Sequence, residues 1–262
     1  MRVAAIIPAR YASTRFPGKP LVPILGRPMI LHVAERVQEA CEAGIVDRVL
    51  VATDDERIAK VVREAGHEVR MTSPAHPTGT DRLAEVASSL EEPLICNVQG
   101  DEPLIEPDTI AALLEPMRAD PSLPMATLKT ALDRPEDLFD PNRGKVVVDV
   151  AGRALTFTRL PIVDYVGPLQ DYFNRERVER EHREGGAVVF SDIGIYAYRR
   201  EMLLRYPSLE RTPFERRERL EQLRALEHGY PIAVPTVRHR ALEVDTPEDL
   251  ARVEAALRSP SH

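Results

Sequence analysis

The chain has 262 residues, of which 43% are hydrophobic, enough for one sizeable core or a core with a smaller lobe. The formal net charge of −7 disfavours nucleic acid as a partner, because a phosphodiester backbone would be repelled. Cys41 and Cys96 are too few for a disulfide framework and lie too far from any histidine pair for a zinc site, so we expect a cytoplasmic protein. The first apolar run, "VAAII", is too short for a signal peptide, and no segment reaches membrane-spanning length, so no membrane insertion is expected.

Apolar periodicity predicts alternating strands and helices in the first half of the chain. The expected strands cover residues 3–7, 48–55, 67–71 and 93–103, and the expected helices cover 27–40, 56–65 and 78–90. This alternation is typical of an α/β fold with a mostly parallel sheet and helices on both faces. A ligand site then lies at the carboxyl ends of the strands.

From Pro124 onward the expected strands come at closer spacing, which predicts an extension of the sheet and a small antiparallel lobe. The polar segment 165–187 is expected to be a loop or arm. The expected elements are strands at 125–130, 145–150, 154–160 and 188–200, one long helix at 213–228, and a last helix at 247–258 that Asp245 or Thr246 could cap.

The loop after the first strand, "RYASTRFPGKP", concentrates basic residues and backbone amides. It has neither the GxxxxGK[ST] spacing of a Walker loop nor a GxGxxG pattern. Arg10, Arg15 and Lys19 could cradle a triphosphate there, and the alternative is a solvated loop whose basic side chains face water.

Two further segments carry candidate binding groups. "NVQGDEP" places Gln99 and Asp101 at the end of an apolar strand, where a carboxylate could hold a metal; a simple turn is the alternative. "TGTDR" begins a helix with Thr80 and Arg82 in its first turn, where the helix N-terminus attracts anions; an ordinary capped helix is the alternative.

Together these segments resemble the 3-deoxy-manno-octulosonate (KDO) cytidylyltransferase family. The resemblance runs in order from Ile6 to about Glu254, through "IPARYASTRFPGKPL", "VATDD", "TGTDRLAE", "NVQGDEP", "GIYAYRR", "LEQLRAL" and "VDTPEDL". It implies a single Rossmann-like nucleotidyltransferase domain, 1–262, in which 1–123 mainly binds nucleotide and 124–262 mainly binds sugar and forms a homodimer. It also implies the reaction, which is transfer of CMP from CTP to an acidic eight-carbon sugar with release of pyrophosphate, for lipopolysaccharide biosynthesis.

The resemblance assigns the nucleotide and metal residues. It implies that Arg10 and Lys19 hold the triphosphate, that Ser13 supports the same loop, and that Thr80 and Arg82 help to hold cytidine. Asp101 and Asp245 are the implied ligands of Mg²⁺, a cation that prefers carboxylate and phosphate oxygens. The catalytic set is therefore Arg10, Lys19 and Asp101. No His or Cys base is evident, so the metal is expected to favour ionisation of the sugar hydroxyl.

The sugar residues implied by the resemblance are Gln99, Arg159, Tyr196, Glu218 and Gln222. A guanidinium such as that of Arg159 can bind a carboxylate through two hydrogen bonds. Glu218 and Gln222, four residues apart, are expected to share one helix face. The alternatives are a surface ion pair for Arg159 and a solvated helix face for the other two.

The sequence departs from the family pattern at two places in this half. Asp192 stands where the family usually has His before "IGIY", and the chain reads "FTRLPIVDY" where the family usually continues "FSR" into "IP". An acidic side chain near an anionic sugar would repel it. KDO is nevertheless the leading acceptor, because Arg159, Tyr196, Glu218 and Gln222 keep their family positions. A KDO analogue or a sialic acid is the enzymatic alternative, and a non-catalytic CTP-binding protein is the alternative from another class.

Overall fold

The structure, a computed structural model, describes residues 1–12, 16–132, 135–161, 189–238, 244 and 247–258. Within these residues, one nine-stranded sheet runs through the molecule. Its main path is β11-β7-β10-β6-β1-β4-β5, and β8 and β9 branch from β10. The fold class predicted from the sequence is confirmed.

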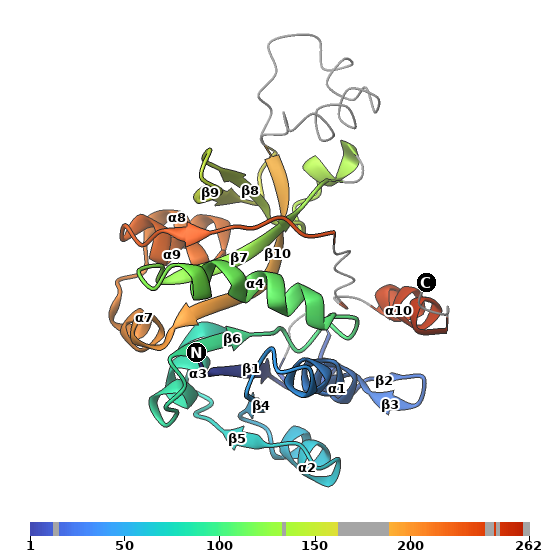
Figure 1. Ribbon diagram of the computed structural model, residues 1–262. Helices are drawn as coiled ribbons and strands as arrows, with labels where there is room; N and C mark the ends of the chain where they lie inside the picture. Colours follow the sequence, from blue (N-terminus) through green and yellow to red (C-terminus); the bar gives the residue numbers. More distant parts are fainter. Residues whose placement is uncertain (13–15, 133–134, 162–188, 239–243, 245–246, 259–262) are drawn as a thin grey trace.

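The first half forms the parallel part of the sheet, at the bottom of Figure 1. β1 (Val3–Ala9) lies between β4 (Arg48–Thr53) and β6 (Leu94–Asn97), parallel to both. β5 (Val69–Met71) is parallel to β4. The connecting helices are α1 (Met29–Glu42), α2 (Glu56–Glu64) and α3 (Gly79–Ser88).

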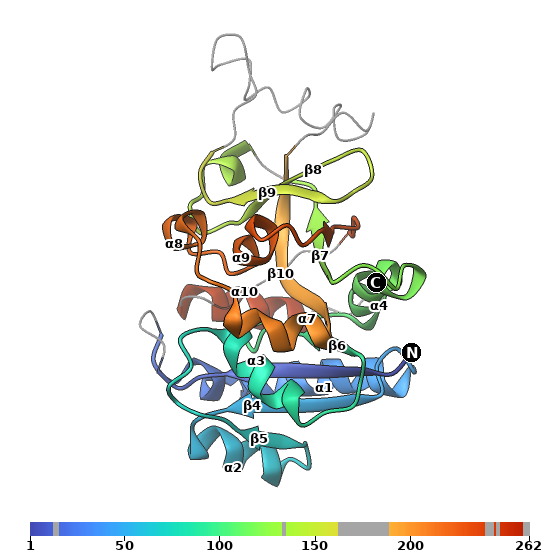
Figure 2. The same cartoon turned by 90° about the vertical axis from the view of Figure 1, so that its left-hand side faces the viewer.

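The second half continues the sheet with antiparallel strands. β10 (Val189–Arg199) is antiparallel to β6, to β7 (Met125–Thr130) and to β8 (Lys145–Val148), and Figure 2 shows it crossing the middle of the molecule. β8 and β9 (Ala154–Thr158) form an antiparallel pair, and β11 (Ile232–Ala233) pairs parallel with β7. The predicted antiparallel lobe is therefore present.

The remaining helices and short elements complete the described fold. The helices are α4 (Pro107–Ala119), α7 (Arg200–Arg205), α8 (Pro213–Glu218), α9 (Gln222–Glu227) and α10 (Pro247–Arg258). Short 3-10 turns are η1 (Lys19–Leu21), η2 (Pro135–Leu138) and η3 (Tyr206–Ser208), and β2 (Pro23–Ile24) pairs with β3 (Arg27–Pro28).

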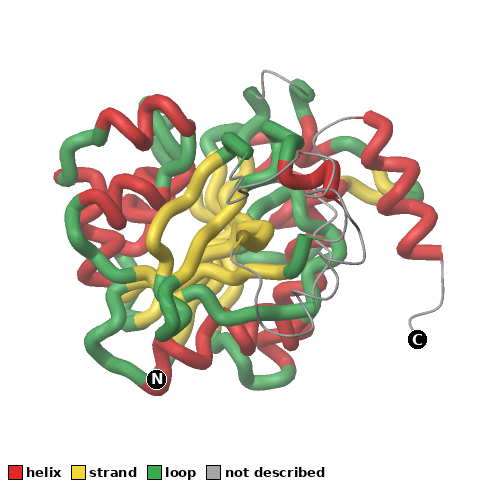
Figure 3. Tube along the Cα trace, turned by 90° about the horizontal axis from the view of Figure 1, so that it is seen from above, coloured by secondary structure: helices red, strands yellow, loops and turns green. Residues whose placement is uncertain are grey.

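Apolar side chains cover both faces of the sheet, as alternation along each strand requires. One face packs against α1, α2 and α4, and the other packs against α3, α7 and α9. Seen from above, the helices lie on both sides of the strands (Figure 3). A smaller apolar cluster joins α10 to Ile24 and Met29.

Two sequence predictions about helices need correction. The single helix expected over 213–228 is wrong, because the chain forms α8 and α9 with Arg219 between them in the left-handed region, at φ 57° and ψ 40°. Glu218 and Gln222 therefore belong to different helices. The sequence-based prediction also had no helix at the position of α4, which begins at Pro107 and contains Pro116.

Candidate functional site

The carboxyl ends of the parallel strands bring the predicted nucleotide residues to one edge of the sheet. Arg10 follows β1, and Gln99 and Asp101 follow β6. Gly100 allows the close approach of these two strand ends, because a Cβ atom there would lie 2.8 Å from the carbonyl oxygen of Pro8. Only glycine fits at that position without a shift of the backbone.

Lys19 and Asp101, 82 residues apart in the chain, meet at this edge. Lys19 Nζ donates to Asp101 Oδ2 at 2.6 Å, and both side chains are mostly buried. Gly18, at φ 73°, turns the loop into η1, and its amide donates to the carbonyl oxygen of Tyr11. The loop therefore delivers the lysine to the strand-end carboxylate.

Arg10 has the hydrogen-bonding capacity that a phosphate ligand requires. One of its terminal guanidinium nitrogens is buried and has no hydrogen-bond partner within the described part of the chain. A buried donor of this kind is costly unless a ligand or water satisfies it. Ser13 and Arg15, predicted for the same loop, lie outside the described residues.

The predicted second metal ligand, Asp245, also lies outside the described residues. Its neighbour Val244 is described, and the Val244 amide donates to the carbonyl oxygen of Asp101 at 3.1 Å. The chain therefore passes beside Asp101 immediately before residue 245. Among the described side chains there is no cluster of three or more His, Cys, Asp or Glu residues that could hold a metal ion.

Arg82 is fully buried, although it was predicted to help hold cytidine. Its guanidinium lies 2.9 Å from Asp54 Oδ2 and donates to the hydroxyl of Thr72. These contacts tie the first turn of α3 to the residues that follow β4 and β5. Its role toward a nucleotide stays a prediction.

Thr80 contacts a carboxylate that the sequence reading did not single out. The Thr80 amide donates to Glu221 Oε2 at 3.1 Å, and the Thr80 hydroxyl donates to the same oxygen. The anion at the N-terminus of α3 is therefore a side chain from the linker between α8 and α9. Glu221 lies in the motif "LEQLRAL", directly before Gln222, and this position was the sequence feature that could have identified it.

A second group of predicted residues meets on the antiparallel side of the sheet. Asp192 Oδ2 accepts hydrogen bonds from Gln222 Nε2 at 2.8 Å and from the Tyr196 hydroxyl at 3.0 Å. Burial, and secondarily the charge of Asp192, raise the pKa of Tyr196 well above its ordinary value, so its hydroxyl remains a donor. Gln99 reaches toward this group by donating to the carbonyl oxygen of Gly194 at 3.1 Å.

Glu218 contacts Arg159 through the backbone amide of Arg159. Glu218 Oε2 accepts from the backbone amide of Arg159 and from the hydroxyl of Thr158, both at 2.8 Å. The Arg159 guanidinium donates to the carbonyl oxygens of Asn142 and Pro141. Among the described residues, these backbone carbonyls are the hydrogen-bond partners of the Arg159 guanidinium, and its role toward a sugar carboxylate stays a prediction.

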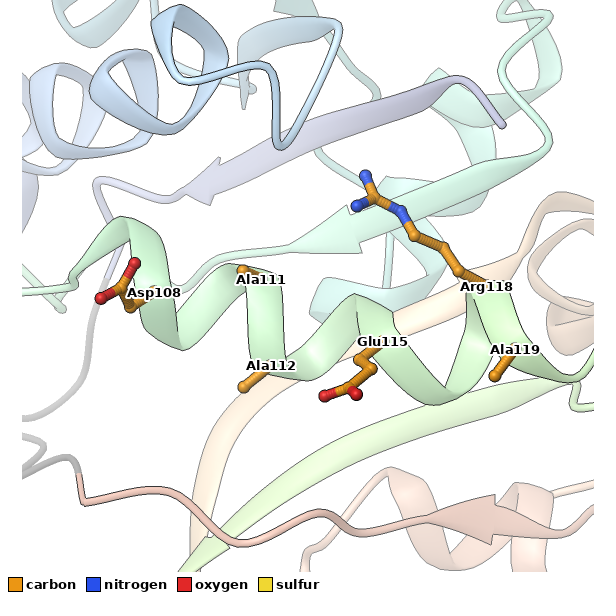
Figure 4. Close-up of a pocket in the computed structure, with 6 residues that line it drawn as sticks. All are labelled: Asp108, Ala111, Ala112, Glu115, Arg118 and Ala119. Carbon is orange, nitrogen blue, oxygen red and sulfur yellow. The ribbon is translucent and has the colours of Figure 1, made fainter.

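A shallow hollow on α4 lies apart from these residues (Figure 4). It is lined by Asp108, Ala111, Ala112, Glu115, Arg118 and Ala119. None of the residues predicted for binding or catalysis is among them.

Comparison with known proteins assigns the family. A family model described as "Cytidylyltransferase" matches residues 4–234. The 3-deoxy-manno-octulosonate cytidylyltransferase of Syntrophotalea carbinolica is 51% identical over 258 residues, covering 98% of this chain and 99% of that protein. The enzyme of the same name from Geobacter metallireducens is 47% identical over 253 residues, covering 97% and 96%. The chain belongs to the 3-deoxy-manno-octulosonate cytidylyltransferase family.

The fold agrees with this family assignment. A solved structure of CMP:2-keto-3-deoxy-manno-octonic acid synthetase complexed with CTP superposes with a TM-score of 0.85 at 40% identity, covering 98% of each chain. A cytidylyltransferase from Leptospira borgpetersenii, at 17% identity and a TM-score of 0.62, shares the fold. Among the described residues, no helix is long and apolar enough to cross a membrane.

Proposed function

We propose that this protein transfers CMP from CTP to 3-deoxy-manno-octulosonate, giving the CMP-sugar and pyrophosphate for lipopolysaccharide biosynthesis. The observation that carries the proposal is the meeting of Lys19 and Asp101 at the carboxyl ends of β1 and β6. A cation and a carboxylate at that edge suit a triphosphate with its counter-ion. The names of the relatives support the choice of nucleotide and acceptor.

In this mechanism, Arg10 and Lys19 hold the triphosphate and oppose the charge that builds up on the leaving pyrophosphate. The buried nitrogen of Arg10, which has no hydrogen-bond partner among the described residues, supports this role. Thr80 and Arg82 lie in the first turn of α3 and are assigned to the cytidine side, with Ser13 in the phosphate loop. The sugar hydroxyl attacks the α-phosphorus in line, so both substrates must be held at once.

Asp101 and Asp245 are the residues that would hold Mg²⁺. A strand-end carboxylate and phosphate oxygens suit this ion, and the Val244–Asp101 hydrogen bond supports a second carboxylate nearby. When bound, the ion would neutralise phosphate charge and favour ionisation of the attacking hydroxyl. The carboxylate oxygens of Asp101 and Asp245 are donors of the kind that Mg²⁺ prefers.

The acceptor side is assigned to Gln99, Arg159, Asp192, Tyr196, Glu218 and Gln222. All of these except Gln99 lie in 124–262, the part that mainly serves the sugar, whereas 1–123 mainly serves the nucleotide. A homodimer formed through this half is part of the proposal. We further propose a cytoplasmic location, where CTP is available.

Asp192 favours a second candidate acceptor. Its carboxylate is held by Tyr196 and Gln222, and it would attract an amino group more than a second carboxylate. A KDO analogue that carries an amino group is therefore the alternative, ahead of a sialic acid.

The test is pyrophosphate release from CTP and Mg²⁺ with KDO, 8-amino KDO or N-acetylneuraminate offered separately. The parent and Asp192→His are compared with each acceptor. KDO turnover that is equal or better in Asp192→His supports KDO, whereas a selective loss with the amino sugar supports the analogue. A folded parent that binds CTP but releases no pyrophosphate with any acceptor would refute the enzymatic proposal.

A further inference from the structure

Strand β10 contains an irregularity beside the acceptor residues. Its pairing with β7 runs in register from Ser191 to Ile193 and resumes in a shifted register at Tyr196. Such a bulge bends a strand and changes the direction of nearby side chains, and bulges are common next to active sites. Asp192 and Tyr196 flank this one.

Thr127 of β7 holds the bulge from one side. Its fully buried hydroxyl lies 2.8 Å from the carbonyl oxygen of Ile195 and 3.0 Å from that of Ile193. It also lies 3.3 Å from Asp192 Oδ1. A hydroxyl has one proton to donate, so these three oxygens share it or receive it in turn.

Gln99 holds the bulge from the other side through its hydrogen bond to Gly194. A side chain from β7 and one from the residues just after β6 therefore hold the consecutive backbone carbonyls of Ile193, Gly194 and Ile195. The other carboxylate oxygen of Asp192, Oδ2, accepts the hydrogen bonds from Gln222 and Tyr196.

We propose that Thr127 is a positioning residue of the acceptor site. Its hydroxyl sets the geometry of the β10 bulge, and the bulge sets the direction in which Asp192 and Tyr196 present their polar atoms. This inference rests on the proposed function, because it assigns Asp192 and Tyr196 to the acceptor. Thr127 acts through these residues and does not contact the nucleotide residues Lys19 and Asp101.

The test compares Thr127→Val, which keeps the shape and removes the hydroxyl, with Thr127→Ser, which keeps the hydroxyl. Pyrophosphate release is measured with CTP and acceptor varied separately. Thr127→Val should raise the KM for the acceptor about tenfold, the scale of one hydrogen bond to a charged group, and leave the KM for CTP unchanged. Thr127→Ser should restore the parent value.

Thr130→Val is the matched control, because Thr130 lies on the same strand with its side chain on the opposite face. It should behave like the parent, and thermal unfolding of every variant separates lost stability from lost positioning. If Thr127→Val does not fold, Thr127→Cys supplies the weakened donor and should raise the acceptor KM by at least about threefold.

An equal rise in both KM values, or an acceptor KM like that of the parent, would overturn the inference while the proposed function stands. An equal loss in Thr127→Ser and Thr127→Val would also overturn it, since the hydroxyl would then be irrelevant. A parent that turns over no acceptor would overturn both.

Discussion

Lys19 Nζ lies 2.6 Å from Asp101 Oδ2, although the two residues are separated by 82 positions in the chain. The ammonium therefore sits where a phosphate oxygen and a metal carboxylate would both be within its reach. Because the two side chains are in contact, their mutations are expected to be coupled, and each charge is therefore removed in its own variant.

Lys19→Ala should lower kcat/KM for CTP by about two orders of magnitude, or about 3 kcal/mol of transition-state stabilisation, as for one preorganised electrostatic contact. Steady-state kinetics with CTP varied would measure it. Lys60→Ala is the control, because Lys60 is an exposed lysine paired with Glu64. Unchanged kinetics in Lys19→Ala would mean that Lys19 pairs with Asp101 without contributing to catalysis.

Asp101→Asn should keep the fold and remove most turnover, because it removes one negative ligand from the site assigned to Mg²⁺. Pyrophosphate release at saturating Mg²⁺ measures this, and circular dichroism checks the fold. The nearby Glu106→Gln serves as control, since Glu106 is the exposed residue before α4 and, within the described part of the chain, its side chain makes no capping hydrogen bond. Pyrophosphate release by Asp101→Asn at the parent rate would contradict the assignment of Asp101 as a Mg²⁺ ligand.

Arg219→Gly should stabilise the protein by about 0.5–1 kcal/mol, because a non-glycine residue is strained in the left-handed conformation found there. Urea unfolding measures the change. Arg217→Gly, within α8, should instead destabilise by about 1 kcal/mol, the cost of glycine in a helix. If both variants lost stability equally, residues 213–227 would be one continuous helix in solution.

Glu215→Gln should lower the free energy of unfolding at pH 7 by about 3 kcal/mol, because it leaves the buried guanidinium of Arg224 without its carboxylate. Burial raises the pKa of Glu215, but the hydrogen bonds and charge of Arg224 outweigh this effect and hold the pKa below its ordinary value. The stabilisation is therefore fully present above the unfolded pKa of about 4.3 and is lost as the pH falls through the folded pKa.

The difference between parent and Glu215→Gln should accordingly shrink in urea unfolding at pH 3 relative to pH 7. Glu64→Gln, which removes an exposed partner of Lys60, should have little effect at either pH. A difference that stayed constant between the two pH values would exclude an ionised Glu215 as the source of the stability.

Local signals predicted the parallel half of the fold well. Thr78, for example, was within the quoted helix start and does cap α3, because its hydroxyl accepts from the Asp81 amide. The prediction of one helix over 213–228 was wrong because the break falls at Arg219, and an arginine gives no turn signal. α4 was omitted, and its internal Pro116 interrupts the usual helical pattern.

Tertiary pairing explains what the sequence could not predict at the site. The resemblance named Gln222 and Asp192, but only the fold brings them within hydrogen-bonding distance. Glu221 and Thr127 were missed because their partners, Thr80 and the β10 bulge, are distant in sequence. The roles of the predicted residues toward substrates remain predictions.

The position of β10 has a consequence for synthesis of the chain on the ribosome. β10 enters the sheet between β6 and β7, both of which are translated earlier. Until Arg199 has left the exit tunnel, the edge of β6 that will receive it has unpaired amides and carbonyls. Because β10 supplies hydrogen bonds to strands from both halves, the nascent chain cannot complete either half independently, and the open β6 edge is where mispairing between neighbouring nascent chains would begin.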